Sequence, residues 1–579
     1  MKNKARICDI ILSAILFLVP FLHVNIGLSV ADQGYNLANF EMFPHMNQTW
    51  MIATLVANLV GKIFTLLPFG HYMVGMNVYC TLLLSAISVL LYFILKKDYN
   101  KYSVFIGLLI AVFFSWAPKV TLYQYLSYYL FCIVALILVK GLFLQKRKLL
   151  YIAGVLLGLN LFVRFPNITQ AMLIIVVPFY AVLYKREIKE VVKDIIVCIA
   201  GYGSVVIPVI LVIELLCGKG TYIGMVHGLF AMTEQAASYT PFSMVSGMYT
   251  SYLEGIKWFK WFLLEMVIFT GIYGFLRKKW QKYCSHALLA LGFVVILRIY
   301  WYWGVLNIRY TEYTSVYIWG VCFLLMSILL LLAVIVWPKY EKNKKVYALT
   351  VLVIIFITPL GSNNVLYSNF NNLYLVAPVV IGTLTDILAK QKDREKSEKK
   401  RLWNVSAVPT ILVGYMLVGL LLVQTGMFHA FFVFGDEGIN GNKKYIVQGN
   451  EVLTGIYTTE ANAEEFSNIT AYMEQERFLD AEYIVWGHSP VLFYALELDC
   501  AIGHIWPTLD SYSQEEMEED IAVLDEYPII IYESRYYSDL FDDSVEWDDK
   551  TKMICQLLKN GEYTEVYRGD YYAICIPGK

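Results

Sequence analysis

The sequence has few charged residues and lacks the motifs of most soluble enzymes. Charged residues make up 16% of the chain, whereas a soluble globular chain carries about 25%. The ten cysteines form no C-x-x-C pair and no cluster with histidine, which argues against a metal site. Residues 435–579 contain no glycine-rich phosphate loop, no catalytic-triad spacing and no nucleic-acid signature. A soluble nucleotide-binding enzyme, a triad hydrolase and a nucleic-acid partner are therefore all disfavoured.

Long apolar runs and an acidic tail are what the sequence does contain. Apolar residues make up 58% of the chain and aromatic residues 16%. Residues 1–434 hold 37 Lys and Arg against 17 Asp and Glu, and residues 435–579 hold 9 against 30. This asymmetry predicts a membrane domain over 1–434 and a soluble domain over 435–579. Cys500, Cys555 and Cys575 of the soluble domain could form one disulfide, and the sequence does not favour any pair.

The first apolar run, residues 7–28, follows Lys2, Lys4 and Arg6. Ser29-Val30-Ala31 resembles a signal-peptidase site, so a cleaved signal peptide is one interpretation. The run is longer than the 7–15 residues of a signal-peptide core and long enough to span a bilayer. We therefore interpret it as an uncleaved first span.

Apolar runs recur up to Phe434, and clusters of basic residues fall between alternate pairs of them. The positive-inside rule places these clusters in the cytoplasm. Thirteen spans satisfy every cluster, with the N-terminus cytoplasmic and the C-terminal domain outside a cell membrane that the chain crosses many times. The predicted spans are 7–28, 73–95, 103–119, 124–144, 149–164, 168–184, 194–216, 259–276, 285–304, 315–337, 346–360, 373–389 and 402–430.

Residues 31–71 form an external segment too apolar for an ordinary loop. Its stretch Trp50–Leu67 is amphipathic and predicts a helix lying in the membrane interface. In the soluble domain, short β-rich runs alternate with acidic stretches of helical spacing, which predicts a small α/β domain. The predicted strands are Leu453–Tyr457, Tyr483–Trp486 and Ile529–Tyr532, and the predicted helices are Ala461–Phe478 and Gln514–Leu524.

The stretch Ala31–Tyr35, Ala-Asp-Gln-Gly-Tyr, places the carboxylate of Asp32 where membrane should meet water. An ionisable side chain beside a span is a functional-site hypothesis by default, although Asp is also a favoured helix N-cap. Few ionisable residues of the membrane domain face outward on this topology, and they combine several cations with five acids. Such a set could position a phosphate through arginine and take a proton through a carboxylate. Tryptophans and tyrosines at this level could stack on sugars, or could form an ordinary interfacial belt.

These features resemble the GT-C-type membrane glycosyltransferases, which include the protein mannosyltransferase and aminoarabinose transferase families. Asp32-Gln33-Gly34-Tyr35 is similar to their Asp-Glu-x-x-Tyr motif after the first span. The stretch 59–70 is similar to their second juxtamembrane helix, and 151–164 to a span that ends in arginine. The run Tyr483–Pro490 is similar to a strand and turn of the external domain in some members. The expected fold is thus a GT-C-like polytopic α-helical membrane protein of bacterial type, with an extracytoplasmic α/β domain.

The resemblance implies inverting transfer of a sugar from a polyprenyl-phosphate donor to a glycan, lipid or protein acceptor outside the cell. Asp32 is then the general base, and Lys62, Arg164 and Arg309 are expected at the lipid phosphate. Tyr35 and Gln124 complete the predicted substrate-binding set.

The sequence departs from the family pattern where many relatives carry a second acid, because the loop 116–124 has none. Glu41 is the alternative second acid, or a solvated loop residue. Because arginines can neutralise the leaving phosphate, no essential metal and no cofactor are expected. Other interpretations are a multi-pass transporter or lipid flippase, a polymerase or ligase of surface glycans, and a non-catalytic receptor.

Overall fold

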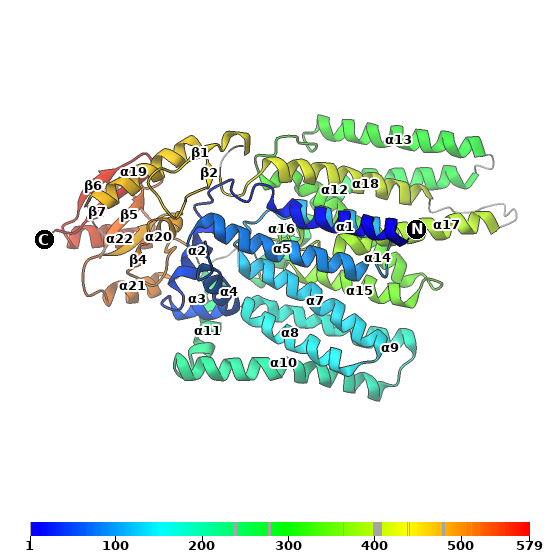
Figure 1. Cartoon of the computed structure of the whole chain (residues 1–579), viewed down its shortest axis with the longest axis horizontal. Helices are drawn as coiled ribbons and strands as arrows, with labels where there is room; N and C mark the ends of the chain where they lie inside the picture. Colours follow the sequence, from blue (N-terminus) through cyan, green and yellow to red (C-terminus); the bar gives the residue numbers. More distant parts are fainter. Residues whose placement is uncertain are drawn as a thin grey trace.

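The computed structural model shows a bundle of long helices that carries a small α/β region at one end (Figure 1). The structure describes residues 2–235, 240–275, 279–362, 364–397, 408–436, 438, 440–476, 481–510, 512–542 and 544–578. The N-terminus lies at the end of the bundle that is remote from the α/β region, and the C-terminus lies on the far side of that region.

Each of the thirteen predicted spans contains a helix, although the first span, 7–28, is helical only up to Phe21. Seven helical segments among the described residues are long and apolar enough to cross a membrane. They are α5 (Met73–Leu95), α7 (Leu122–Leu144), η2 with α9 (Phe165–Tyr184), α10 (Ile188–Leu216), the part Tyr283–Tyr302 of α13, η4 with α14 (Tyr313–Val336) and α18 (Val408–Phe431).

The remaining predicted spans correspond to helices that are shorter or more polar at one end. These are α1 (Lys2–Leu18), α6 (Lys101–Phe114), α8 (Arg147–Val163), α12 (Pro241–Phe275), α15 (Lys342–Ile357) and α17 (Val376–Ser397). The predicted start of the last span at residue 402 lies outside the described residues. The chain is therefore a polytopic helical membrane protein.

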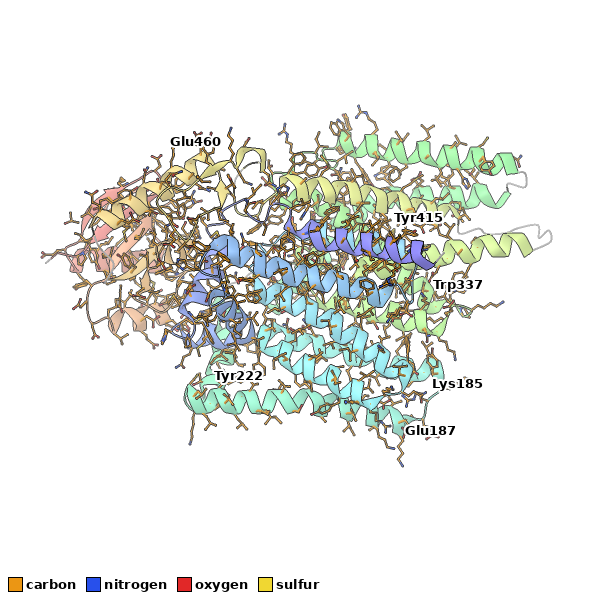
Figure 2. All side chains as sticks on the ribbon, viewed as in Figure 1. Lys185, Glu187, Tyr222, Trp337, Tyr415 and Glu460 are labelled. Carbon is orange, nitrogen blue, oxygen red and sulfur yellow. The ribbon has the colours of Figure 1, made fainter. Side chains whose placement is uncertain are left out.

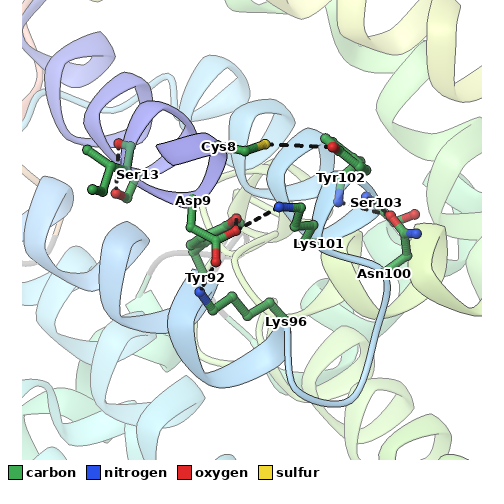
Figure 3. Close-up of polar contacts among 10 residues, drawn as sticks. Cys8, Asp9, Ser13, Tyr92, Lys96, Asn100, Lys101, Tyr102 and Ser103 are labelled. Atoms are coloured by element: carbon green, nitrogen blue, oxygen red, sulfur yellow. Dashed lines mark hydrogen bonds and ion pairs between the residues drawn. The ribbon is translucent and has the colours of Figure 1, made fainter. Parts of the chain in front are cut away.

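An ion cluster joins three helices at the end of the bundle where the chain begins (Figure 3). The Asp9 carboxylate accepts from Lys96 Nζ at 2.7 Å and from Lys101 Nζ at 3.0 Å, and the Tyr92 hydroxyl donates to it at 3.0 Å. The cluster therefore ties α1 to α5 and to the start of α6. Lys185 and Glu187 lie at the same end of the molecule, whereas Glu460 lies on the α/β region (Figure 2).

Three short helices lie between the bundle and the α/β region: α2 (Asp32–Met42), α3 (Gln48–Ala53) and α4 (Leu55–Thr65). The last two cover most of the stretch predicted as an interfacial helix. Among the described residues of α4, Leu59 and Ile63 are exposed while Ala57 and Asn58 are buried. The helix α4 is therefore amphipathic, and its exposed side is apolar. Helix α11 (Thr221–Gln235) packs against α3 on the same side of the molecule.

The α/β region contains a five-stranded sheet in the order β4-β3-β5-β7-β6. Strand β3 pairs in parallel with β4 and with β5, whereas β7 pairs antiparallel with β5 and with β6. Their bounds are β3 (Glu482–Trp486), β4 (Asp499–Cys500), β5 (Ile529–Glu533), β6 (Thr564–Arg568) and β7 (Tyr572–Ile576). The helices are α19 (Glu460–Glu476), α20 (Val491–Ala495), α21 (Gln514–Ala522) and α22 (Asp549–Asn560).

The predicted strands Tyr483–Trp486 and Ile529–Tyr532 and both predicted helices are confirmed, although the last two residues of the helix predicted over Ala461–Phe478 lie outside the described residues. The predicted strand Leu453–Tyr457 is wrong, because residues 452–455 form turns. Only Tyr457 of that stretch lies in a strand, β2 (Tyr457–Thr458), which pairs with β1 (Tyr445–Ile446). None of the ten cysteines forms a disulfide, so the disulfide considered for Cys500, Cys555 and Cys575 is not formed.

The α/β region and the bundle share one hydrophobic core. Its buried residues come from α2, α4, α5 and α7 on one side and from β3, α20 and β7 on the other. Backbone bonds add to this contact, since Val491 N donates to Val30 O at 3.1 Å and Gly27 N to Tyr457 O at 2.7 Å. The first residues of α2 are therefore held between the two parts of the molecule.

Candidate active site between the bundle and the α/β region

Asp32 is the first residue of α2, and among the described residues its carboxylate has no partner. Ala31 occupies the N-cap position, and no side chain makes a capping hydrogen bond there. The residue is partly buried, and no hydrogen bond or ion pair to its carboxylate occurs within the described part of the chain. Burial without a compensating partner raises the pKa of Asp32 to about 6. The side chain is therefore not an N-cap, and its pKa suits a base that works near neutral pH.

Two neighbours of Asp32 in sequence fix its position. Gln33 is buried, accepts from Ser29 N at 3.2 Å and donates to Asn77 Oδ1 at 2.9 Å, which ties the start of α2 to α5. Gly34 lies against α20, where an added Cβ would be 2.4 Å from the backbone of Val491. Only glycine permits this approach, so the motif holds Asp32 through the residues that follow it.

Three phenol hydroxyls lie within electrostatic range of the Asp32 carboxylate. They belong to Tyr35 of α2, Tyr123 of α7 and Tyr313 of η4 (Tyr313–Val316). Burial, with a smaller effect from the nearby Asp32 charge, raises the pKa of Tyr35 to about 12. The Tyr35 phenol is thus a neutral hydrogen-bonding group at any physiological pH. These groups could orient a hydroxylated substrate at the carboxylate.

Tyr123 connects this group to two further residues predicted from the sequence. The guanidinium carbon of Arg164 lies 5.4 Å from the centre of the Tyr123 ring, and Gln124 Nε2 donates to the Tyr123 hydroxyl at 3.4 Å. Arg164 Nη2 also donates to the carbonyl of Gly361 at 2.9 Å, which fixes the guanidinium. The structure therefore gathers Asp32, Tyr35, Gln124 and Arg164 around one tyrosine.

The α/β region covers this site with the loops that follow its parallel strands. Because β3, β4 and β5 are parallel, their carboxyl ends meet at one edge of the sheet, the usual ligand-binding edge of such sheets. The Trp506 ring is 5.9 Å from that of Tyr35 and 6.1 Å from that of His488, and His488 is 5.7 Å from Tyr536. An aromatic surface thus extends from Tyr35 onto the α/β region.

A fully buried carboxylate holds these loops in place. Glu533 accepts from His488 N at 3.1 Å, from the Ser489 hydroxyl and from Arg535 Nη2 at 3.5 Å. The Tyr572 hydroxyl donates to Ser489 Oγ at 2.9 Å and extends the network into β7. Since the oxygens of Glu533 are occupied, this carboxylate has a structural role.

Three predicted site residues are not brought to Asp32. Lys62 Nζ donates to the backbone carbonyl of Glu41 at 2.7 Å and lies 3.7 Å from its carboxylate, so these two residues pair with each other. Glu41 is nine positions after Asp32 on the same helix, about 14 Å along its axis. Arg309 is exposed in the loop between α13 and η4, and no side-chain contact links it to Asp32 among the described residues.

Several residues of this site were not selected from the sequence. Tyr313, His488, Trp506 and Tyr536 lie hundreds of positions from Asp32 and carry no motif that points to it. Two signals were available for His488. One is the likeness of Tyr483–Pro490 to a strand and turn of external domains. The other is the parallel order of β3 and β5, which places the residues after these strands at one edge. Within the described part of the chain, no group of three or more His, Cys, Asp or Glu side chains is arranged to hold a metal ion.

Solved structures give the comparison with known proteins, because no protein-family model and no curated protein matches the chain significantly. The chain is similar to the oligosaccharyltransferase of Archaeoglobus fulgidus in complex with zinc and sulfate, with 10% identity, a TM-score of 0.47, and 92% of this chain and 69% of that chain covered. For the archaeal oligosaccharyltransferase AglB from Archaeoglobus fulgidus, in complex with an inhibitory peptide and a dolichol-phosphate, the identity is 12% and the TM-score 0.46, and 97% of this chain and 73% of that chain are covered.

A third structure is that of the same oligosaccharyltransferase, tethered by a disulfide bond to an acceptor peptide with the NVT sequon. Its identity to this chain is 11%, its TM-score 0.45, and 99% of this chain and 74% of that chain are covered. Oligosaccharyltransferase is a GT-C glycosyltransferase, the class that the sequence motifs resemble. The likeness concerns overall architecture.

Proposed function

We propose that this protein is a glycosyltransferase that moves a sugar from a polyprenyl-phosphate donor to an acceptor at the outer face of the membrane. The observation that carries this proposal is the Asp32 carboxylate, which lies partly buried and unpartnered between the bundle and the α/β region. A buried polar group normally has a partner. A carboxylate that is kept free, with a pKa raised to about 6, is better suited to proton transfer than to stabilising the fold.

The reaction follows from the acid–base chemistry of this site. Asp32 accepts the proton of an acceptor hydroxyl while that oxygen attacks the anomeric carbon of the donor sugar. The bond between that carbon and the phosphate oxygen breaks on the opposite face, so the configuration at carbon is inverted. The phosphate departs with the bonding electron pair, and Asp32 later releases its proton to water. Arg164 supplies positive charge toward this region, and the aromatic surface of Tyr35, Trp506 and Tyr536 offers stacking for sugar rings.

The acceptor remains a glycan, a lipid or a protein in this proposal. Its binding surface is the edge of the α/β region where the loops after β3, β4 and β5 meet Tyr35. The donor approaches from the membrane side, because its polyprenyl chain stays in the bilayer. Asp32 lies between these two approaches, as an in-line displacement requires.

The substitution Asp32→Asn tests the proposal, because it keeps the shape of the side chain and removes its basicity. We expect transfer from a radiolabelled polyprenyl-phosphate sugar to fall by about a hundredfold or more, since a general base contributes about 10²–10⁴-fold. Glu41→Gln is the matched control, because it removes a carboxylate from the far end of the same helix and should retain most activity. Full transfer by Asp32→Asn would disprove the role of this carboxylate.

The same purified proteins distinguish a glycosyltransferase from a transporter or flippase. Vesicles containing the purified protein would then move lipid-linked sugar across the membrane without forming a new glycosidic bond. Movement that is unaffected by Asp32→Asn, together with an absence of transfer, would favour that alternative.

A further inference from the structure

A cavity of about 100 Å³ lies beside the candidate active site. It is enclosed by the segment after α1, the start of α5, the loop between α6 and α7, and the end of α18. Gln33, the residue after Asp32, forms part of its wall, as does Trp116, which stacks on Tyr313 with ring centres 4.8 Å apart. Two residues of the cavity wall are therefore direct neighbours of residues at the candidate active site.

The polar groups of this cavity are those of an anion site. Of the described residues that line it, none is acidic, and Lys119 carries the one fixed charge. Lys119 Nζ donates to Ser115 O at 3.2 Å, and no carboxylate lies within ion-pair distance of it in the described part of the chain. The ammonium also lies 5.5 Å from the centre of the Tyr125 ring. A lysine ammonium has three hydrogen atoms to donate, so it can still donate to a ligand.

Two further polar atoms in the wall have no hydrogen-bond partner. They are Thr81 Oγ1, on a side chain that is 0% exposed, and His429 Nε2. A buried polar atom without a partner costs stability, and an unpaired buried charge costs more. Burial alone lowers the pKa of Lys119 to about 8, so the side chain is still mostly charged at neutral pH. An anion between Lys119 and Thr81 would satisfy both of these side chains.

The depth of the cavity indicates what carries the anion. Its wall includes the first turns of α5 and the last turn of α18, where two membrane helices end. This is the level of lipid head groups, at the boundary of the hydrocarbon core. Leu22 lines the cavity and is 55% exposed, and Leu18 before it is 62% exposed. The side of the cavity near α1 is therefore apolar and accessible, as the approach of a lipid chain requires.

We propose that this cavity is a phosphate site in which Lys119 is the charged ligand, with Thr81 as a hydrogen-bonding ligand, and that it receives the phosphate end of a lipid. The phosphate chemistry stands on the cavity alone, whereas assigning the lipid to the polyprenyl donor rests on the proposed function. In that reaction Lys119 neutralises the phosphate as it leaves, at a place where Lys62 and Arg309 do not reach.

The test measures equilibrium binding to the purified full-length protein in detergent. The probes are a polyprenyl phosphate, the corresponding polyprenol and inorganic phosphate. We expect Lys119→Gln to weaken binding of polyprenyl phosphate by about tenfold or more, because charge-assisted hydrogen bonds to phosphate are the strong ones. Thr81→Val should weaken it less, and Lys119→Arg should retain most of it. Lys219→Gln is the control, since Lys219 is exposed in the turn between α10 and α11.

Binding of polyprenyl phosphate by Lys119→Gln at wild-type affinity would overturn the proposal. Equal affinity of the wild-type protein for polyprenol and polyprenyl phosphate would also overturn it. Inorganic phosphate that binds as tightly as the lipid, and depends on Lys119, would support the phosphate site and overturn the lipid assignment. If Lys119→Gln does not fold, loss of binding in Thr81→Val with retention in Lys119→Arg supports the proposal, and the reverse overturns it.

Asp32→Asn separates this inference from the proposed function. That variant should bind polyprenyl phosphate as the wild-type protein does while losing transfer. If it keeps transfer, the proposed function fails and the binding result stands on its own. If it loses transfer but Lys119→Gln binds normally, the phosphate site fails and the proposed function stands.

Discussion

Asp32, Asp436 and Glu533 are three of the carboxylates near the junction of the two parts of this protein, and they differ in their hydrogen-bond partners. Asp436 accepts from Leu28 N at 2.8 Å and from Thr458 Oγ1 at 3.0 Å, and Glu533 is similarly saturated by its neighbours. Asp32 alone among these three accepts nothing. Hydrogen bonds account for the placement of the first two residues, whereas no structural demand accounts for the third. A free carboxylate in such surroundings is the pattern of a reactive group.

The raised pKa of Asp32 predicts how activity depends on pH. A general base works only when deprotonated, and the pKa of Asp32 is raised by burial to about 6. We therefore expect transfer at saturating substrate to rise between about pH 5 and pH 7 and then to level off. A pH–rate profile on purified protein with synthetic donor measures this. A flat profile over the same range, with the protein still folded, would contradict the assignment of Asp32 as the base.

The raised pKa of Asp32 also predicts how the stability of the folded protein depends on pH. The direction is opposite to that expected for a carboxylate in an ion pair. Because the pKa in the folded protein lies above the ordinary value of 3.8, the folded state holds the proton more tightly than the unfolded state. The contribution of Asp32 to stability is therefore present below about pH 4 and is lost as pH rises through about 6.

Asp32→Asn removes this loss, so we expect its apparent melting temperature to exceed that of the wild-type protein by a few degrees at pH 7.5. The difference should vanish near pH 4. Thermal unfolding in detergent at a series of pH values measures it. A variant that is less stable than the wild type at pH 7.5 would mean that the carboxylate has a stabilising partner.

At the scale of elements, the contact between α2 and α20 sets the distance between Asp32 and the α/β region. Gly34→Ala would place a Cβ 2.4 Å from backbone atoms of Val491, which cannot move without displacing α20. We expect a loss of about 1–3 kcal/mol of stability, as for other overpacked sites, together with a loss of transfer. Thermal unfolding and the transfer assay measure these effects.

Gly224→Ala is the matched control for this change, because nothing lies within 4 Å of a Cβ at that helical position. Alanine is also the better helix former, so this control should be at least as stable as the wild type. Wild-type stability and activity in Gly34→Ala would mean that α20 does not depend on this contact.

Secondary-structure elements were predicted well from the sequence where the hydrophobic pattern and the distribution of charged residues were clear. All thirteen long apolar runs became helices, because a run of that length can satisfy its backbone in a membrane in no other way than as a helix or a closed barrel. The prediction of a strand over 453–457 was wrong because Leu453 and Ile456 are buried although they lie in a turn region. Apolar character alone does not distinguish a buried strand from a buried turn. The strands β6 and β7 and helices α20 and α22 were missed, since their patterns are short.

The residues of the candidate site were also predicted with unequal success. Asp32 and Tyr35 were predicted through a local motif, and Arg164 through the likeness of 151–164 to a span that ends in arginine. The structure places these three residues and Gln124 around Tyr123. Glu41, Lys62 and Arg309 were grouped with them because all face one side of the membrane, and sharing a face does not fix distance within it. Lys119 was not selected, because the sequence does not reveal which side chains surround it in the fold.

At the scale of the whole molecule, the arrangement of charge makes a prediction about orientation. The end of the bundle with the N-terminus carries the cluster of Asp9 with Lys96 and Lys101, and Lys185 lies at that end as well. The α/β region lies at the opposite end (Figure 1). The positive-inside rule then places the N-terminal end in the cytoplasm and the α/β region outside, as transfer at the outer face requires.

Cysteine labelling tests this orientation in a background in which exposed Cys284 is replaced by serine. Lys97 is exposed in the turn between α5 and α6, and Glu460 is exposed at the start of α19. We expect a membrane-impermeant maleimide to label Glu460→Cys in intact cells or right-side-out vesicles, and to label Lys97→Cys only after permeabilisation. The opposite pattern would place Asp32 at the cytoplasmic face, where the donor would have to be presented from inside the cell. Labelling of both before permeabilisation would mean that the two ends are not separated by a membrane, and the predicted topology would then be wrong as a whole.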